Sequence, residues 1–435
     1  MSFDPRNRAL ALCGIIVLAS ACALARSASL PAHAAAGAAY GVLAMSGVLG
    51  AILAWERRDR TALLIVLAIA LAARIALFAS PPLFSHDAYR YLWDGRVMLA
   101  GHDPLALAPR DPALARLARD PLFASVDYRT IPSLYPPFAY VLFFAGALLR
   151  VGAYGEKAVM LAGDLLAITL ALAVLARRKL PLGRVAAYAW SPLVLVEFAQ
   201  NGHVESWAVA AVLAAALALA AERRTLAAAA LACATLVKLT PLAFVPVAFA
   251  RAPRAAIGCG LACAAAFIVA YACGVPVFGS LGHYVAGQRF FPTIFRVVGP
   301  FGAATLLTCA IAWATWRRRG GSSFESGVIA VQVAFMLCTP NALPWYAALV
   351  PAVVPLVDAQ RRAWRVGRIT LLFGAAALPL IYGPPVFLPV TPQSVPRSHL
   401  RRCCALPPMR HCSPVVNSGG RSYPRSSYDV HLARD

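Results

Sequence analysis

The chain has 435 residues, of which 60% are hydrophobic and only 13% are charged. Soluble domains carry about a quarter charged residues, so this composition excludes an ordinary soluble protein and predicts a multi-spanning membrane protein. The formal net charge of +22 comes from Arg clusters that separate apolar segments, as in short cytoplasmic loops, and not from a basic surface interleaved with aromatics, so we predict no nucleic-acid partner.

The first three apolar segments lie at about residues 9–26, 34–55 and 62–79. Each is close to the ~20 residues that cross a bilayer as a helix. The short basic N-terminus and the charged run 56–60 are both predicted to be cytoplasmic, so the third helix ends on the outer side. Arg74, near the outer end of that helix, either extends to the membrane interface or binds a phosphate.

Residues 80–134 form a long polar loop on the predicted outer side. Within it, residues 85–103 hold the densest mixture of acidic, basic and aromatic side chains in the chain. Ser85 is a good helix N-cap, and Asp87 falls in the first turn, where the helix dipole favours an anion. Gly101 is the kind of residue that commonly follows the last turn of a helix and ends it. The sequence therefore predicts a short helix here, and a second short surface helix at 111–121.

One face of the predicted helix collects polar side chains at spacings of three, four and seven, which are Asp87, Arg90, Tyr91 and Asp94. Its apolar residues point elsewhere and are predicted to rest on a membrane surface: Ala88, Leu92 and Leu99. The spacing leaves two interpretations open. Either Asp87 is a catalytic base held by its neighbours, or this is a solvated interfacial helix with a surface pair between Arg90 and Asp94.

The next apolar runs lie at about 138–152, 157–176, 184–199 and 204–221. If all four cross the membrane, the basic loops 177–179 and 222–224 lie outside, against the usual charge bias. If instead residues 137–150 and 240–250 enter the membrane and return to the same side without crossing it, every basic loop lies in the cytoplasm, as the positive-inside bias predicts. Both topologies remain open, and together they predict about 11–13 spanning helices.

Two polar features interrupt these runs. Asp164 lies inside an apolar run, and such intramembrane acids are functional candidates by default, although a pair with Arg150 or Lys157 is the alternative. The turn 200–205 contains His203 and is flanked by Glu197 and Glu205. It is either an interfacial turn with hydrogen-bonded side chains or, if the dipping topology holds, a part of the site on the outer side.

Lys238 is embedded in apolar sequence and is followed by Pro241, which breaks a helix. A cation at a helix break suits a phosphate at the membrane surface; the alternative is a structural pair with an acid such as Asp164. A second outer loop, 274–296, carries Gln288 and Arg289 among aromatics. Arg289 is a second phosphate candidate, or else contacts lipid headgroups within an aromatic belt.

The remaining apolar segments lie at about 255–273, 298–316, 324–339, 343–357 and 368–388. Trp345 and Tyr346 follow an outer-face turn and either line a sugar pocket or anchor the chain at the interface. From about residue 391 the sequence becomes rich in Pro, Arg and Ser without apolar periodicity. We therefore predict one membrane domain, 1–390, and a disordered tail, 391–435.

The run H-D-A-Y-R-Y-L-W-D-G-R at 86–96, followed by G-H-D-P-L at 101–105, resembles the first outer loop of the GT-C membrane glycosyltransferases. It is most similar to the polyprenyl-phosphate-sugar-dependent enzymes of glycosyltransferase family 87 and related bacterial mannosyltransferases. The resemblance implies an all-α polytopic fold whose long first periplasmic loop carries short juxtamembrane helices. It also implies that Asp87 is the catalytic base and that the Lys-x-x-Pro motif at 238–241 serves the lipid-phosphate end of the donor.

The resemblance departs at Asp103-Pro104-Leu105, where relatives often have Asn-Pro-Tyr. It implies transfer of a hexose, with mannose favoured, from a polyprenyl-phosphate-sugar to a hydroxyl of a lipid or cell-envelope glycan, with inversion, at the outer face of the bacterial inner membrane. The predicted substrate-binding residues are His86, Arg90, Tyr91, Asp94, Arg96, His203, Lys238, Gln288 and Arg289.

These residues require no cofactor, although a divalent metal is compatible with them. The expected partners are the lipid-linked donor, the glycan or lipid acceptor and membrane lipids. Two other classes fit the intramembrane charges, namely a transporter or flippase and a polymerase or ligase for lipid-linked sugars. Transporters usually show internal repeats and short loops, which this sequence lacks.

Overall fold

The computed structural model describes residues 4–27, 33–287, 293–357 and 362–382. These residues form helices and connecting turns without a strand, which confirms the predicted all-α fold. The predicted disordered tail, 391–435, lies outside the described residues, and so do Gln288 and Arg289.

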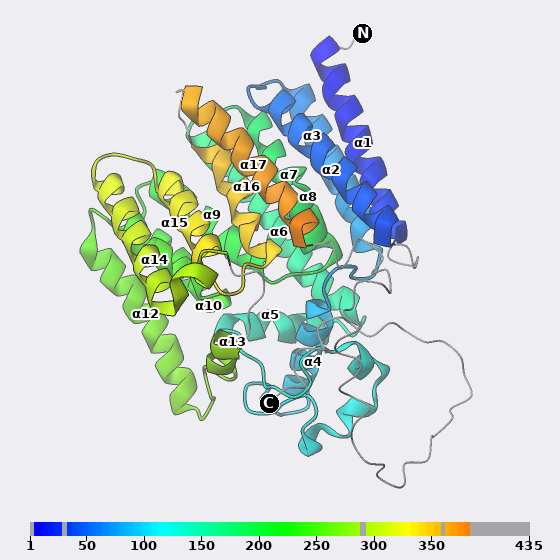
Figure 1. Ribbon diagram of the computed structural model, residues 1–435, viewed down its shortest axis with the longest axis vertical. Helices are drawn as coiled ribbons and strands as arrows, with labels where there is room; N and C mark the ends of the chain where they lie inside the picture. Colours follow the sequence, from blue (N-terminus) through cyan, green and yellow to red (C-terminus); the bar gives the residue numbers. More distant parts are fainter. Residues whose placement is uncertain (1–3, 28–32, 288–292, 358–361, 383–435) are drawn as a thin grey trace. The chain divides into compact units, whose positions relative to one another are not determined.

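Six helices in the described part are long and apolar enough to cross a membrane. They are α1 (Pro5–Ser27), α2 (His33–Ala54), α3 (Arg60–Phe78), α6 (Ala153–Arg177), α12 (Pro253–Ala272) and α14 (Phe295–Arg319). Shorter helices pack among them: α9 (Glu205–Ala220), α10 (Arg224–Val237), α15 (Phe324–Cys338) and α17 (Arg362–Tyr382). Figure 1 shows α1, α2, α3 and α17 running in roughly the same direction, with α12 and α14 on the other side of the bundle.

Three other segments consist of short helical pieces, and two of them, 184–199 and 343–357, were predicted as single apolar spans. The first comprises η4 (Leu182–Val185), α7 (Ala186–Ala189), α8 (Pro192–Val194) and the π-helical η5 (Leu195–Gln200). The second comprises η6 (Thr240–Phe244) and α11 (Val245–Ala248), and the third η7 (Pro344–Ala348), α16 (Leu349–Val353) and η8 (Val354–Leu356). Prolines stand in the first turn of α8, η6 and η7, where a missing N–H costs least.

The basic loops meet at one end of the bundle, which we call the basic end. Arg58 Nη1 donates to the carbonyl oxygen of Lys179 at 3.0 Å. The backbone amide of Gly183 donates to the carbonyl oxygen of Arg57 at 3.1 Å. Arg177 in turn reaches Ala220. The loops after α2, α6 and α9 therefore lie together, as the positive-inside bias requires.

This arrangement decides the topology that the sequence left open. Because α6 ends beside the α2–α3 loop, α5 (Pro137–Leu148) does not cross, and the interpretation with residues 138–152 as a span is wrong. Figure 1 shows α5 lying across the other end of the bundle.

The prediction that residues 240–250 enter the membrane without crossing it is also wrong. Lys238 lies near Glu205 at the end that carries α5, whereas Arg251 binds the Arg319 carbonyl at the basic end, so the segment between them crosses the bundle.

The predicted outer helix is present as α4 (Asp87–Leu99). Its N-cap is His86, one residue later than predicted, while the hydroxyl of Ser85 accepts a hydrogen bond from the amide of Asp87 at 3.1 Å. Gly101 follows the helix with φ of +80°, the left-handed conformation that ends many helices. We call the end of the bundle that carries α4 the α4 end.

The apolar side of α4 packs inside the protein and not on a membrane surface. A Cβ at Gly95 would lie 2.3 Å from the carbonyl oxygen of Phe143, so only glycine permits this close crossing of α4 over α5. Ala88 and Leu92 are buried, which contradicts their predicted contact with the membrane, whereas Leu99 is exposed. The prediction failed because α5 covers the face that was expected to rest on lipid.

The rest of the outer loop folds into three short 3₁₀ helices, η1 (Pro112–Leu114), η2 (Leu117–Arg119) and η3 (Pro121–Ser125), in place of the single surface helix predicted at 111–121. Asp111 and Asp120 each cap the proline-initiated turn that follows. Pro121 ends the short run of helical residues before a full α-helix can form, because a proline interrupts the backbone hydrogen-bond ladder.

A buried ion pair joins α3 to α6. Arg74 donates to Asp164 through Nε at 2.7 Å and Nη2 at 3.1 Å, and neither side chain is exposed. The Tyr188 hydroxyl also donates to Asp164, at 2.9 Å. Arg74 therefore neither extends to the interface nor faces a phosphate, and the predicted partners of Asp164, Arg150 and Lys157, are wrong.

Lys157 instead binds the end of α3. Its ammonium donates to the carbonyl oxygens of Leu77, Phe78 and Ser80. A cation at a helix C-terminus satisfies carbonyls that have no partner within the helix and is favoured by the helix dipole. This contact fixes the point at which the chain leaves α3 and enters the loop that carries Asp87.

Candidate active site

Three side chains form a row at the α4 end. His203 is fully buried, its Nδ1 lies 3.4 Å from Asp87 Oδ2, and its Nε2 lies 3.2 Å from Glu197 Oε2. Glu197 is almost completely enclosed, whereas 26% of the Asp87 side chain is exposed. Asp87 is therefore the member of the row that a substrate can reach.

The turn that carries His203 is held by its own side chains. Asn201 Nδ2 donates to Glu197 Oε2 at 2.9 Å, and Asn201 Oδ1 accepts from the amides of Leu83 and Phe84 at 3.1 and 3.2 Å. Gly202 has φ of +72°, a conformation that side-chain-bearing residues rarely adopt. One asparagine thus joins the turn to the segment that leads into α4.

The ring of His203 is also fixed by stacking. Trp345, from η7, lies parallel to it with ring centroids 4.0 Å apart and an interplanar angle of 20°. Stacking thus defines the plane of the imidazole, whose Nδ1 and Nε2 lie close to the two carboxylates without the alignment of a hydrogen bond to any described residue. From the sequence alone, Trp345 either lines a sugar pocket or anchors the chain at the interface; the stack on His203 places it in the site.

A second ion pair lies beside the row. Lys238 Nζ is 2.8 Å from Glu205 Oε1, and it lies 5.0 Å from the ring centroids of both Tyr135 and Tyr346. Burial disfavours the charged form of Lys238, but Glu205 outweighs it and raises the pKa of Lys238 above its usual value. Its partner is therefore Glu205, and not Asp164 as one prediction proposed.

Hydroxyl groups connect the two ion pairs. The Tyr91 hydroxyl donates to Asp87 Oδ2 at 3.4 Å and lies 3.2 Å from the Tyr135 hydroxyl. Tyr91 stacks on Phe143 with centroids 4.4 Å apart, and Tyr135 meets the same ring edge-on. Contacts therefore run from Asp87 through the Tyr91 hydroxyl to Tyr135, and the ring of Tyr135 lies next to the Lys238 ammonium. Asp87 and Lys238 belong to one continuous cluster.

A small pocket, partly open to the surroundings, adjoins the ammonium. Its polar lining consists of Glu205, Lys238, Thr240, Gln332, Trp345 and Tyr346, and its apolar lining of Ala208, Val209, Val212, Pro241, Phe244 and Leu349. A cation beside an apolar slot suits a ligand with an anionic head and a hydrocarbon chain. Within the described residues, no group of three or more His, Cys, Asp or Glu side chains is arranged to hold a metal.

The charges of the row support one another. Burial favours the protonated form of Asp87, but His203, Lys238 and the Tyr91 hydroxyl outweigh it and hold the pKa of Asp87 below its usual value. Burial likewise disfavours the imidazolium, but Asp87 and Glu197 outweigh it and raise the pKa of His203 to about 10. At neutral pH Asp87 is therefore a carboxylate and His203 an imidazolium.

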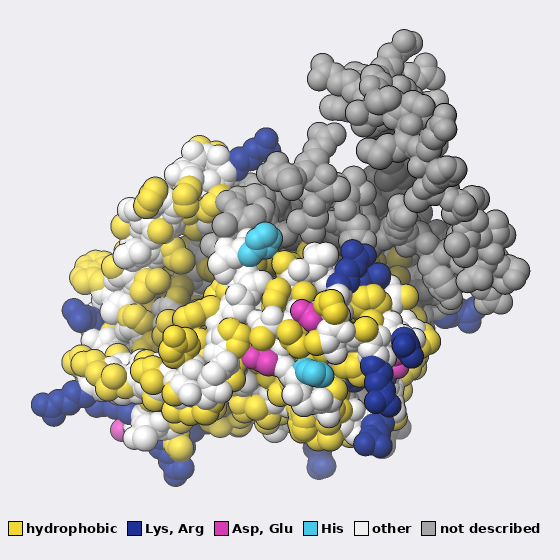
Figure 2. Space-filling view, turned by 90° about the horizontal axis from the view of Figure 1, so that it is seen from below, with side chains coloured by type: hydrophobic (Ala, Val, Ile, Leu, Met, Phe, Trp, Pro, Cys, Tyr) yellow, Lys and Arg dark blue, Asp and Glu magenta, His cyan; other side chains and the backbone are white. Residues whose placement is uncertain are grey.

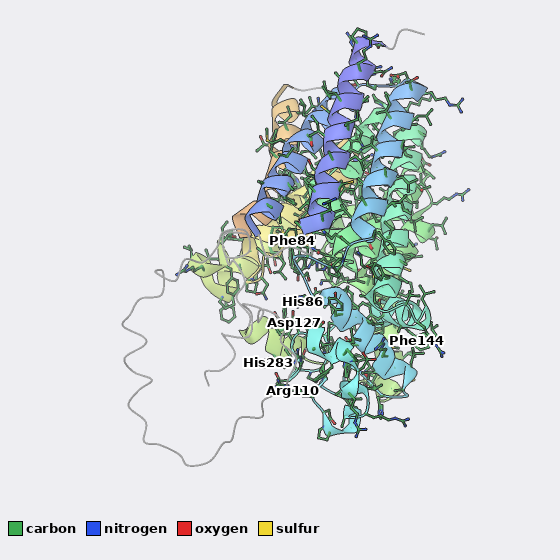
Figure 3. All side chains as sticks on the ribbon, turned by 90° about the vertical axis from the view of Figure 1, so that its right-hand side faces the viewer. Phe84, His86, Arg110, Asp127, Phe144 and His283 are labelled. Atoms are coloured by element: carbon green, nitrogen blue, oxygen red, sulfur yellow. The ribbon has the colours of Figure 1, made fainter. Side chains whose placement is uncertain are left out.

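Of the predicted site residues, the structure brings Asp87, Tyr91, His203 and Lys238 together. Others pair within the outer loop: Arg90 Nε with Asp94 Oδ1 at 3.0 Å, His86 Nδ1 with Asp127 Oδ2 at 3.3 Å, and Arg96 Nη1 with Asp120 Oδ2 at 2.8 Å. Figure 3 shows His86 and Asp127 next to each other at the α4 end. The predicted substrate contacts of these loop residues stay predictions.

Arg90 and Asp94 have extensive contacts inside the loop. Asp94 Oδ2 accepts from the Ser133 hydroxyl at 2.6 Å, and the guanidinium of Arg90 donates to the carbonyl oxygens of Tyr128 and Ile131 at 3.0 and 3.1 Å. Both side chains are buried. The pair therefore holds the loop against α4, which contradicts the solvated surface pair considered from the sequence.

Sequence reasoning gave no role to several members of the cluster. From the sequence, Glu197 and Glu205 only flank the His203 turn, and nothing there indicates a role for Tyr135. Gln332, which donates to the Tyr346 carbonyl at 2.8 Å and lines the pocket, was not singled out. A signal existed for the two glutamates, because acids in apolar runs need partners.

The comparisons with known proteins add the family. A family model described as Alpha-(1->6)-mannopyranosyltransferase, N-terminal domain, matches residues 8–254, which include Asp87, Glu197, His203 and Lys238. Neither the curated proteins nor the solved structures gave a significant match to the chain. Since the family model covers more than half of the 435 residues, the chain belongs to the alpha-(1->6)-mannopyranosyltransferase family, which confirms the predicted membrane glycosyltransferase.

Proposed function

We propose that the protein transfers mannose from a polyprenyl-phosphate-linked donor to a hydroxyl of a lipid or cell-envelope glycan. The observation that carries this proposal is the cluster in which a partly open carboxylate, Asp87, lies near a buried ammonium, Lys238, that borders an apolar pocket. A base and a phosphate-binding cation are the two groups that such a transfer needs.

The chemistry follows from the leaving group. A lipid phosphate is a weak base and departs without a general acid, unlike the alkoxide that glycosidases release with the help of a second carboxylate. Asp87 takes the proton as the acceptor O–H bond breaks, and the acceptor oxygen forms a bond to the anomeric carbon. The anomeric carbon–oxygen bond breaks with its electron pair going to the phosphate, whose charge Lys238 stabilises.

Glu205 gives Lys238 a partner when no donor is bound. The ion pair of 2.8 Å keeps the buried ammonium charged and directed at the pocket. A donor phosphate would replace this carboxylate in part, and the apolar lining of the pocket would contact the first carbons of the lipid. The pocket therefore supports a lipid-linked donor better than a soluble nucleotide sugar.

The charge of the two ends supports the proposed location. The basic end carries the loops that the positive-inside bias assigns to the cytoplasm, and the cluster lies at the α4 end. Seen from the α4 end, the surface in Figure 2 is largely hydrophobic, with acidic, histidine and Lys or Arg side chains among and around the apolar ones. We therefore place the reaction at the outer face of a bacterial inner membrane.

A donor of defined anomeric configuration tests the proposal. The family name specifies an α-(1→6) product, and a single displacement inverts the anomeric centre, so the donor must be β-linked. We expect membranes that contain the protein to form α-(1→6)-mannosyl product from β-linked polyprenyl-phosphate-mannose and none from the α-linked isomer. Use of the α-linked isomer would contradict inversion, and transfer from a nucleotide sugar without lipid would contradict the donor class.

A second prediction concerns the cation. Lys238→Gln is expected to raise the KM for the lipid donor about 10- to 100-fold, because a hydrogen bond to a charged group contributes about 1.5–3 kcal/mol. The KM for the acceptor should change little. Lys179→Gln removes the same charge at the basic end and serves as the control. Steady-state kinetics with each substrate varied would reject this role if only the acceptor KM rose.

A further inference from the structure

Glu197 is the buried acid whose place in the cluster the proposed reaction does not explain. It lies in η5, behind His203 as seen from Asp87, and its side chain is 4% exposed. Its Oε2 atom receives Asn201 Nδ2 at 2.9 Å and approaches His203 Nε2 at 3.2 Å. It does not line the pocket beside Lys238, so a direct contact with substrate is not its role.

We propose that Glu197 is a positioning residue, which acts through His203 to orient Asp87 and keep it ionised for its role as the base. This inference rests on the proposed function, in which Asp87 accepts the proton of the acceptor hydroxyl. The geometry supports it because one imidazole lies between the two carboxylates of the row, with Nδ1 3.4 Å from Asp87 Oδ2 and Nε2 3.2 Å from Glu197 Oε2.

The dependence of the row on Glu197 follows from burial. A fully buried imidazolium with a single carboxylate would be costly, so it would lose a proton and become neutral without its second partner. Neutral His203 would no longer place a positive charge 3.4 Å from Asp87. Asp87 would then hold its proton more tightly, and less of the enzyme would have a base at a given pH.

Other titratable groups also act on Asp87 and remain in place when Glu197 is changed. Besides His203, these groups are His86, Tyr91, Tyr135, Lys238, Tyr284 and Tyr346. Lys238 is the remaining cation among the groups that lower the pKa of Asp87. Its charge is shared with Glu205, so it compensates only in part for the loss of the imidazolium.

The test is the pH dependence of kcat/KM for mannosyl transfer by the full-length protein in membranes. The acidic limb of this profile reports the protonation of the base in the free enzyme. In Glu197→Gln we expect this limb to move to higher pH by about one unit or more, the size of effect that an adjacent opposite charge has on a carboxyl group. Glu197→Asp retains the charge and should leave the limb close to that of the unchanged protein.

Two further variants complete the experiment. Glu156→Gln alters another fully buried acid, which has no hydrogen-bond partner among the described residues and packs against Gly146, and it should leave the acidic limb in place. His203→Gln removes the imidazole itself and should move the limb in the same direction as Glu197→Gln. It also provides the measurement if Glu197→Gln fails to accumulate in the membrane.

The outcomes separate the two proposals. Loss of activity by the same factor at every pH in Glu197→Gln, or an unmoved limb in His203→Gln, would overturn the role of Glu197 while leaving mannosyl transfer intact. Absence of transfer by the unchanged protein from β-linked polyprenyl-phosphate-mannose would instead overturn the proposed function. A shifted limb in both variants, with Glu197→Asp and Glu156→Gln unshifted, is the result that supports the inference.

Discussion

Asp87→Asn is expected to lower the rate of mannosyl transfer by about 10²–10⁴-fold, the usual contribution of a positioned general base. Asparagine fills the same space and still accepts hydrogen bonds from Tyr91, but it does not take a proton from the acceptor hydroxyl. The loss should appear in kcat, because donor binding depends on Lys238 and the pocket. Radiolabelled β-linked polyprenyl-phosphate-mannose supplied to membranes measures it directly.

The control for this variant is Asp111→Asn in the same outer loop. Asp111 caps η1 by accepting a hydrogen bond from the amide of Ala113 at 2.9 Å, and asparagine caps helices about as well as aspartate. It should transfer mannose at nearly the original rate. If Asp87→Asn were present in the membrane at the normal level and turned over at more than a tenth of that rate, Asp87 would not be the base.

The long apolar helices were predictable because their signal is local. The predicted segments 9–26, 34–55 and 62–79 correspond to α1, α2 and α3 within a few residues, since length and hydropathy suffice to identify a span. The topology after α4 was not predictable in this way. It depended on which loops share an end, and that was decided by contacts such as the one between Arg58 and Lys179, which are far apart in the sequence.

The site was predictable by residue type but not by pairing. Asp87 and Lys238 stood out because an acid at a helix start and a lysine before a helix-breaking proline are unusual in apolar sequence. Their partners, His203 and Glu205, come from a turn more than a hundred residues after α4. No spacing rule connects such positions, so a single sequence names the groups without showing which of them meet.

The largest misassignment from the sequence concerned Arg74 and Asp164. From the sequence, Arg74 extends to the membrane interface or binds a phosphate, and Asp164 is a functional acid or pairs with Arg150 or Lys157. The pair between Arg74 and Asp164 was not among these alternatives. Together they form a bidentate pair that excludes solvent, and Arg74 Nη1 also donates to the carbonyl oxygen of Ala189 at 2.8 Å. The pair thus joins α3, α6 and the broken segment around α7, which are the elements from which the outer loop and the His203 turn extend.

Asp164→Asn is therefore expected to destabilise the protein by about 3–5 kcal/mol, the cost of leaving one member of a buried ion pair without its partner. Asparagine keeps a hydrogen bond with Tyr188 but leaves the guanidinium of Arg74 uncompensated in an interior that water does not reach. The expected result is a large fall in the thermal midpoint of the detergent-solubilised protein and a lower level in the membrane.

The matched control is Asp4→Asn, which removes an acid from the exposed pair with Arg57 at the basic end, where the separation is 3.4 Å. Pairs of that kind contribute about 0–1 kcal/mol, so its midpoint should stay close to that of the unchanged protein. The double variant Arg74→Met with Asp164→Leu should recover much of the loss, because apolar side chains of similar volume often replace a buried ion pair without penalty. Equal midpoints for Asp164→Asn and Asp4→Asn would show that the buried pair does not hold α3 to α6.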